Sequence, residues 1–177
     1  MTTTGGFHLA FSLIAIAAGA VVLLLPKGTR WHRTWGHGYV WSMVGVIVTS
    51  MAMYDLTGRV TPFHFAALVA TVTVAGGMWT VLRRRPRGAW IEAHATWMAW
   101  SYVGLTAALV AESLTRFVMP VAADRLTTGA LWPAFWALVM FGTFGAVAVG
   151  ARLIRTRLPA SIQRAPGAIR RERQELA

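Results

Sequence analysis

Four histidines occupy matched places along the chain. His8 and His64 each lie at the start of an apolar segment, and His37 and His94 each lie near the start of the segment that follows. Two imidazole rings that face each other across a helical bundle can ligate a haem iron from both sides, and such a six-coordinate iron favours electron transfer over oxygen chemistry. We therefore predict a b-type haem protein in which His37 and His94 are the axial ligands and His8 and His64 form a second pair.

A second hypothesis combines histidine with carboxylate. The candidate ligands are His8, Asp55, His64 and Glu112. Imidazole nitrogen and carboxylate oxygen are a suitable donor set for zinc or iron, and a metal ion with an open position can activate water, as in a hydrolase. A simpler explanation covers both acids, because each has an arginine four residues later, Arg59 or Arg116, at the spacing of a helical ion pair.

Composition restricts the class of protein. Of the 177 residues, 56% are hydrophobic and 13% are charged, whereas a soluble domain has about 25% charged residues. Such hydrophobicity excludes a disordered basic tail and a nucleic-acid-binding module, whose charge lies on a soluble surface. The absence of cysteine excludes disulfide frameworks and thiolate metal sites. The composition indicates an integral membrane protein, and a cofactor-free accessory subunit is the third hypothesis for its role.

Five apolar stretches are long enough to cross a bilayer core of about 30 Å, which needs roughly 20 helical residues. They are residues 7–25, 35–54, 63–82, 90–114 and 129–153, and residues 120–128 form the last separating segment. The predicted fold is all-α and integral to the lipid bilayer, with a five-helix membrane domain over residues 1–157. Residues 158–177 are predicted to be a frayed, basic cytoplasmic tail.

Basic residues predict the orientation. If all five stretches span the membrane, 14 of the 17 Lys and Arg side chains fall on one side, in the first loop, the third loop and the tail. The positive-inside rule places that side in the cytoplasm. The N-terminus is therefore expected outside and the C-terminus inside.

A duplicated helical hairpin accounts for the matched histidines. His8 and His64 are 56 residues apart, and His37 and His94 are 57 apart, as are Asp55 and Glu112. Two copies of a unit that crosses the membrane twice share one orientation, so the first four helices are predicted to form a pseudo-two-fold bundle with the fifth helix outside it. Small residues beside the later histidines leave room for a macrocycle; they are Gly36, Gly38, Ala93 and Ala95.

Helical phase predicts which side chains face the interior of the bundle. The face of the first helix carries His8, Ser12, Ala15 and Gly19, and the face of the fourth carries His94, Met98, Ser101, Leu105, Ala108 and Glu112. On the fifth helix, Gly142, Ala146 and Gly150 form a stripe suited to close helix packing. His32 is placed in the first basic loop without a role, because it is five residues from His37 and therefore about 140° away around a helix.

The run Pro26-Lys27-Gly28-Thr29-Arg30-Trp31-His32-Arg33, followed by Gly36 and Tyr39-Val40, resembles a bacterial family of small predicted multi-pass membrane proteins of unknown function. Further matches are Pro62-Phe63-His64, His94 with Met98, Ser101-Tyr102-Val103-Gly104 and Ala111-Glu112. The resemblance covers about residues 7 to 118. It implies a multi-pass protein of the bacterial inner membrane.

The layout is also similar to that of two-haem b-type cytochromes of the ascorbate-reducible kind. Those proteins place four haem-ligating histidines on four consecutive helices and pair them between alternate helices at two depths. By position, His8 with His64 and His37 with His94 take those roles here, and a quinone or another redox molecule is the expected partner. The chain departs from that pattern in having five predicted helices rather than six.

Overall fold

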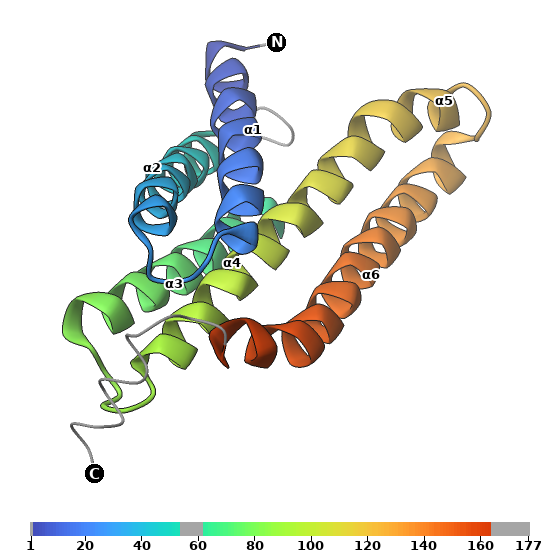
Figure 1. The fold of residues 1–177 in the computed structure, drawn as a ribbon. Coiled ribbons are helices and arrows are strands. Elements are labelled where there is room, and N and C mark those ends of the chain that lie inside the picture. The colour runs from blue at the N-terminus through green and yellow to red at the C-terminus, as the bar shows by residue number, and fades with distance from the viewer. Residues whose placement is uncertain (1, 54–61, 164–177) are drawn as a thin grey trace.

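Helices form the whole of the secondary structure over the residues that the computed structural model describes, which are 2–53 and 62–163. The helices are α1 (Thr3–Leu24), α2 (Arg30–Ala52), α3 (Pro62–Arg83), α4 (Trp90–Ser113), the π-helix η1 (Leu114–Val118), α5 (Met119–Ala123) and α6 (Thr128–Gln163). Figure 1 shows α1 and α2 side by side, and α6 running along α4. The predicted all-α class is confirmed.

The contacts between the first four helices close a ring. α1 packs along α2 and α3 packs along α4, while α2 also contacts α3 and α4 contacts α1. All four helices contribute to one buried cluster, formed by Ala15, Ala18, Tyr39, Met43, Val74 and Leu105. The loops at residues 25–29 and 84–89 lie at one end of this ring, here called the basic end. The starts of α1 and α3 lie at the opposite end.

The basic end explains where α2 begins. Gly28 adopts a left-handed backbone conformation with φ of 78°, which glycine adopts without steric cost. The side chain of Thr29 then accepts a hydrogen bond from the backbone N–H of His32 at 3.2 Å, as an N-cap does. α2 therefore begins at Arg30 rather than at residue 35. The sequence-based placement of His32 in a loop was wrong, because this residue belongs to the first turn of the helix.

The segment predicted to follow the fourth helix is largely helical. η1 and α5 continue α4 as far as Ala123, with Pro120 in the first turn of α5. α6 likewise continues past residue 153 to Gln163, with Pro159 inside it. Because Pro159 cannot donate to the carbonyl of residue 155, a bend is expected there, and the last turns of α6 (red in Figure 1) turn away from the rest of the helix.

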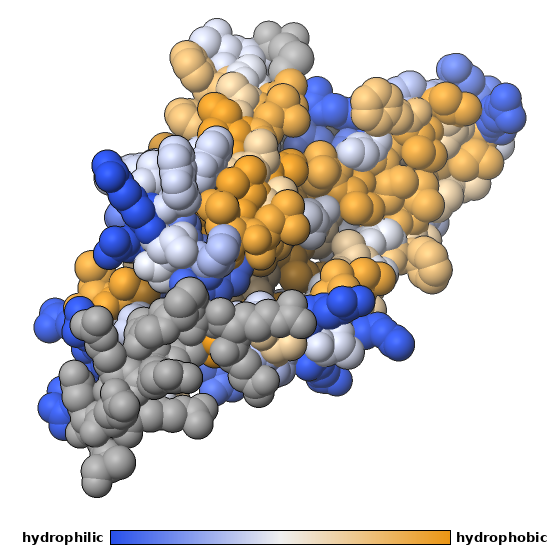
Figure 2. All heavy atoms as spheres, in the orientation of Figure 1, coloured by the Kyte–Doolittle hydropathy of each residue, from blue (hydrophilic) through white to orange (hydrophobic). Residues whose placement is uncertain are grey.

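Apolar side chains cover the outside of the molecule. Leu24, Phe117 and Phe141 are each at least 74% exposed, and Figure 2 shows hydrophobic residues over α1 and over α4 and α6, with hydrophilic residues toward the ends. Within the described residues, four helical stretches are long and apolar enough to cross a membrane: α1, α3, α4 with its continuation to Ala123, and α6. α2 has 23 residues but is more polar, because Arg30, His32 and Arg33 lie at its start. Exposure of so much apolar surface is expected for a protein surrounded by lipid.

The proposed duplication can be compared with the positions of matched side chains on the first four helices. On α1 and α3, His8 and His64 both lie toward the interior of the ring, 56 residues apart. On α2 and α4, the side chains that meet are Tyr39 and Ser101, which are 62 residues apart. The predicted spacing of 57 would align Ser101 with Val44, which is exposed. The structure does not confirm pseudo-two-fold symmetry.

The predicted interior faces are confirmed for α1 and in large part for α4. His8, Ser12, Ala15 and Gly19 are all buried or half-buried. On α4, Ala108 is the exception, because it is exposed. The small-residue stripe of α6 also lies against α4, since a Cβ atom added to Gly142 or Gly150 would collide with side chains of α4 or η1.

We predict that Gly19→Ala destabilises the protein by about 1–3 kcal/mol, the usual cost of overpacking. A Cβ atom at residue 19 would come within 2.5 Å of the Tyr102 ring and 3.0 Å of the Tyr39 ring. Thermal unfolding of the purified protein in detergent measures the effect. Gly104→Ala is the matched control, because a Cβ atom there meets nothing within 4 Å. Equal unfolding temperatures for the two variants would show that α1 and α4 do not approach this closely.

Candidate functional site

Polar side chains gather at the two ends of the ring, with the apolar cluster between them. At the basic end, His32 of α2 lies near Lys27 and near His94 of α4. At the opposite end, His8 of α1 meets Thr49 of α2 and Glu112 of α4. Each end therefore joins groups that are more than 40 residues apart in the sequence.

The imidazole of His94 is held by the backbone of the neighbouring helix. Its Nδ1 atom lies 2.9 Å from the carbonyl oxygen of Gly77 in α3, and a carbonyl can only accept, so Nδ1 donates the hydrogen bond. The absence of a side chain at Gly77 permits this approach, because a Cβ atom there would lie 2.5 Å from the sulfur of Met98. In the neutral ring, the proton on Nδ1 leaves Nε2 with a free lone pair.

His32 lies on the same face of α2 as the buried residues Tyr39 and Met43. Its ring lies close enough to Lys27 and His94 to interact with them electrostatically, and it makes a hydrogen bond with the backbone of Val22. The ammonium of Lys27 donates hydrogen bonds to the carbonyls of Val22 and Leu23, at 3.0 Å and 2.9 Å, at the end of α1.

His37 lies on the other side of α2. It is exposed, as are Trp41, Val44 and Val48, which share its face. The sequence analysis expected His37 and His94 to meet in the interior of the ring. The structure does not bring them together there. The histidine of α2 that lies near His94 is His32.

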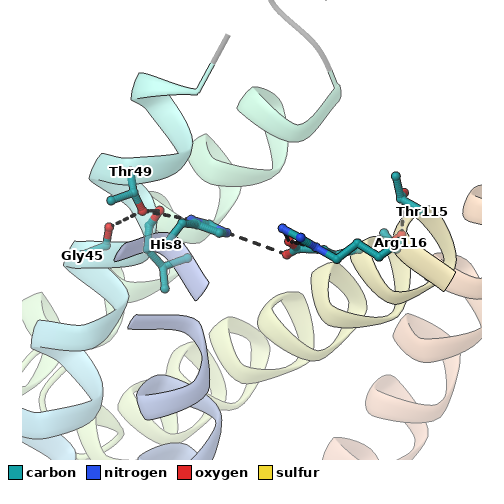
Figure 3. A network of polar contacts seen from close by, with 8 residues as sticks. His8, Gly45, Thr49, Thr115 and Arg116 are labelled. Atoms are coloured by element: carbon teal, nitrogen blue, oxygen red, sulfur yellow. Dashed lines mark hydrogen bonds and ion pairs between the residues drawn. The ribbon is translucent and has the colours of Figure 1, made fainter. Parts of the chain in front are cut away.

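A polar network joins three helices at the opposite end (Figure 3). The hydroxyl of Thr49 donates to the carbonyl of Gly45 at 2.7 Å, so it can only accept from Nδ1 of His8, which lies 2.9 Å away. The Nε2 atom of His8 is then 4.0 Å from a carboxylate oxygen of Glu112. The other oxygen of Glu112 accepts two hydrogen bonds from Arg116, at 2.8 Å and 2.6 Å.

The four proposed metal ligands are only partly brought together. His8 and Glu112 are neighbours, and Asp55 lies outside the described residues. His64 is 5% exposed, so its side chain is buried in the protein. Among the residues that the structure describes, no group of three or more His, Asp or Glu side chains is arranged to hold a metal ion. The local explanation for one acid is confirmed, because Glu112 pairs with Arg116.

His32 and Thr49 are the residues of these sites that the sequence analysis missed. A signal for His32 was present, because one face of α2 carries His32, Gly36, Tyr39, Met43 and Ser50, whereas the face of His37 carries Trp41, Val44 and Val48. Bulky apolar side chains mark the face toward lipid, and small or polar ones mark the face toward other helices. No comparable signal indicated Thr49, whose partner is 41 residues away.

Comparison with known proteins gives one match. The family described as "Predicted membrane protein (DUF2306)" matches residues 6–154. Searches of curated proteins and of solved structures found no significant match. The matched range contains all five histidines and every residue of the two polar sites.

We predict that Thr49→Val lowers the free energy of unfolding by about 1–2 kcal/mol, because the half-buried Nδ1–H of His8 loses its acceptor. Thr49→Ser keeps the hydroxyl and is expected to retain most of the stability. Thermal unfolding in detergent compares the two variants. If valine and serine had equal effects, the hydrogen bond between His8 and Thr49 would contribute nothing to stability.

Proposed function

Since the chain belongs to the family of predicted membrane proteins DUF2306, we propose that it is a membrane protein of the bacterial inner membrane that transfers electrons through a bound b-type haem. The proposal assigns one haem, at the basic end of the ring, with His94 as an axial ligand. A bound haem supplies a reversible one-electron iron couple. The protein supplies the ligands, the low-polarity surroundings and the access for a redox partner.

The orientation of His94 is the observation that carries the proposal. Histidines that ligate metals characteristically donate their other ring N–H to a carbonyl or carboxylate, which fixes the tautomer and the direction of the ring. The Nδ1 atom of His94 makes such a bond with the carbonyl of Gly77 at 2.9 Å. The free Nε2 lone pair is the one a haem iron requires.

The surroundings of His94 also fit a bound haem. Ala93 and Ala95, on either side of His94, are small and half-buried. On α2, a Cβ atom added to Gly36 would meet nothing within 4 Å, so there is open space beside this residue. Apolar surroundings and small neighbouring side chains are what the porphyrin ring needs. The histidine nitrogen is a suitable ligand for the haem iron.

His8 and His64 are not used in the single-haem proposal. The Nδ1 atom of His8 donates to Thr49 and its Nε2 atom faces Glu112. This proximity supports a second candidate function, a metal-dependent membrane enzyme with zinc or iron at the opposite end. For that function, Glu112 must break its ion pair with Arg116 and bind the metal ion instead. For this reason we prefer the haem proposal.

The redox partner is proposed to approach at the basic end. Arg30, Arg33, Arg84 and Arg85 are exposed there, within the part of the chain next to His32 and His94. Positive charge attracts anionic partners and raises their rate of encounter. A quinone headgroup or an anionic electron carrier suits this surface.

The proposed topology has five spans, with α2 as the fifth in addition to the four apolar stretches. At 23 residues and about 1.5 Å per residue, α2 is long enough to cross the hydrocarbon core. The basic end is placed in the cytoplasm by the positive-inside rule.

We predict that the protein, expressed with adequate haem supply and purified in detergent, shows a strong Soret band and sharp α and β bands after reduction. His94→Ala is expected to lower haem content by at least about tenfold, because an axial ligand is lost. Glu92→Gln, an exposed neighbour on the same helix, is the matched control and should leave the spectrum unchanged. Absorption spectra and haem extraction measure both variants.

Two outcomes would contradict the haem proposal. One is a wild-type protein without these bands, and the other is a normal spectrum in His94→Ala. Metal analysis of the same samples separates the second candidate, since stoichiometric zinc or iron without haem, lost in Glu112→Gln, would favour the metal-dependent enzyme.

We also predict the sidedness of single cysteines, which can be introduced one at a time because the chain has none. Thr3→Cys and Met53→Cys should react with a membrane-impermeant maleimide from outside the cell. Pro26→Cys and Arg87→Cys should react only after the membrane is opened. Labelling of Met53→Cys and Pro26→Cys from the same side would show that α2 does not cross the membrane.

A further inference from the structure

We propose that His32 is the second axial ligand and shares the haem iron with His94, while His37 has no part in the site. This inference rests on the proposed function, because it names the partner of His94 at the same haem. It differs from the sequence-based expectation, in which His37 had this role.

The first argument is the rotation of α2. Tyr39 and Met43, which are 2% and 1% exposed, mark the face of α2 that lies inside the ring. His32 is seven residues before Tyr39, which is almost two turns of helix, and so it lies on that face. His37 is two residues before Tyr39, which turns it by about 200° to the outside.

The second argument is the state of the His32 ring. The ring of His32 makes a hydrogen bond with the backbone of Val22, in which a ring N–H donates and the carbonyl accepts. In the described part of the chain, the Nδ1 atom of His32 is buried and has no hydrogen-bond partner. Buried polar atoms nearly always have a partner, so a ring nitrogen left in this condition points to a ligand that completes it.

The third argument is the similar support of the two rings. His94 on α4 is held by the carbonyl of Gly77 on α3, and His32 on α2 is held by the backbone of Val22 on α1. In each case the backbone of the preceding helix makes a hydrogen bond with one ring nitrogen, and the other ring nitrogen has no such bond. The two rings also come from alternate helices of the ring and are close enough to interact electrostatically. Four helices therefore converge on one pair of imidazoles.

Alternative explanations for His32 are weaker. A purely structural histidine in this position would be expected to use both nitrogens, and here only one is used. Lys27 does not serve as its partner, because the buried Nδ1 atom of His32 has no hydrogen-bond partner among the described residues. Among the described residues at the basic end, one ring nitrogen of His32 and one of His94 remain to donate an electron pair to a metal ion.

The test compares His32→Ala with His37→Ala in the full-length protein purified with haem. His32→Ala is expected to lose the sharp α and β bands of a low-spin iron, and added imidazole should restore them by replacing the missing ring. His37→Ala is the matched control on the same helix and should keep the wild-type spectrum. Circular dichroism verifies that both variants remain helical.

His32→Met provides the second variant. Because histidine–methionine ligation raises the potential of a haem relative to bis-histidine ligation, this variant should keep a low-spin spectrum and show a higher midpoint potential. A merely structural role of His32 would leave the potential unchanged.

The outcomes separate the two proposals. Wild-type protein without haem overturns both the function and the ligand. A wild-type haem spectrum that survives in His32→Ala, or that is lost in His37→Ala alone, overturns the ligand assignment and leaves the function standing. If His32→Ala fails to fold, an unchanged potential in His32→Met overturns the assignment and a raised one supports it.

Discussion

A buried hydrogen bond between Tyr39 and Ser101 sets the rotation of α2 within the ring. The two oxygens are 2.8 Å apart, and the hydroxyl of Ser101 donates to the carbonyl of Met98 in its own helix, so Tyr39 donates to Ser101. In a helix surrounded by lipid, a polar side chain without a partner is costly. With Tyr39 held inside, the helical period carries His32 to the interior and His37 to the outside. The identity of the candidate site follows from this rotation.

Close approach of the helices is the second condition, and glycine provides it. At Gly19 the rings of Tyr102 and Tyr39 occupy the space that a side chain would need, and at Gly77 the side chain of Met98 does so. Because lipid offers no hydrophobic driving force for helix association, packing of this kind and hydrogen bonds between helices hold a membrane bundle together. The contact at Gly77 has a chemical consequence as well, since it brings a backbone carbonyl within reach of His94.

The two polar sites are separated by packed side chains and differ in character. The site at the basic end consists of two imidazoles, each with one ring nitrogen that has no assigned partner, beside a surface rich in arginine. The network at the opposite end is already paired, because the carboxylate of Glu112 is shared between His8 and Arg116. A site whose ring nitrogens have no partner is suited to bind a metal or cofactor, whereas a network whose polar groups are already paired is suited to hold helices together. This difference is the reason for assigning the redox role to the basic end.

The sequence by itself determined the features that depend on composition or on neighbours within one helix. These are the helical membrane class, the interior face of α1, the small-residue stripe of α6, and the pairing of Glu112 with Arg116 four residues later. The continuation of α4 through η1 and of α6 past Pro159 was missed, because local helix-breaking signals were overridden by packing between α4, α5 and α6. The tertiary structure decided which residues hold His8, and it decided between the two faces of α2, although their difference in residue size was already present in the sequence. The physical reason is that the helical period is local, whereas the rotation of a helix depends on partners such as Ser101, which is 62 residues from Tyr39.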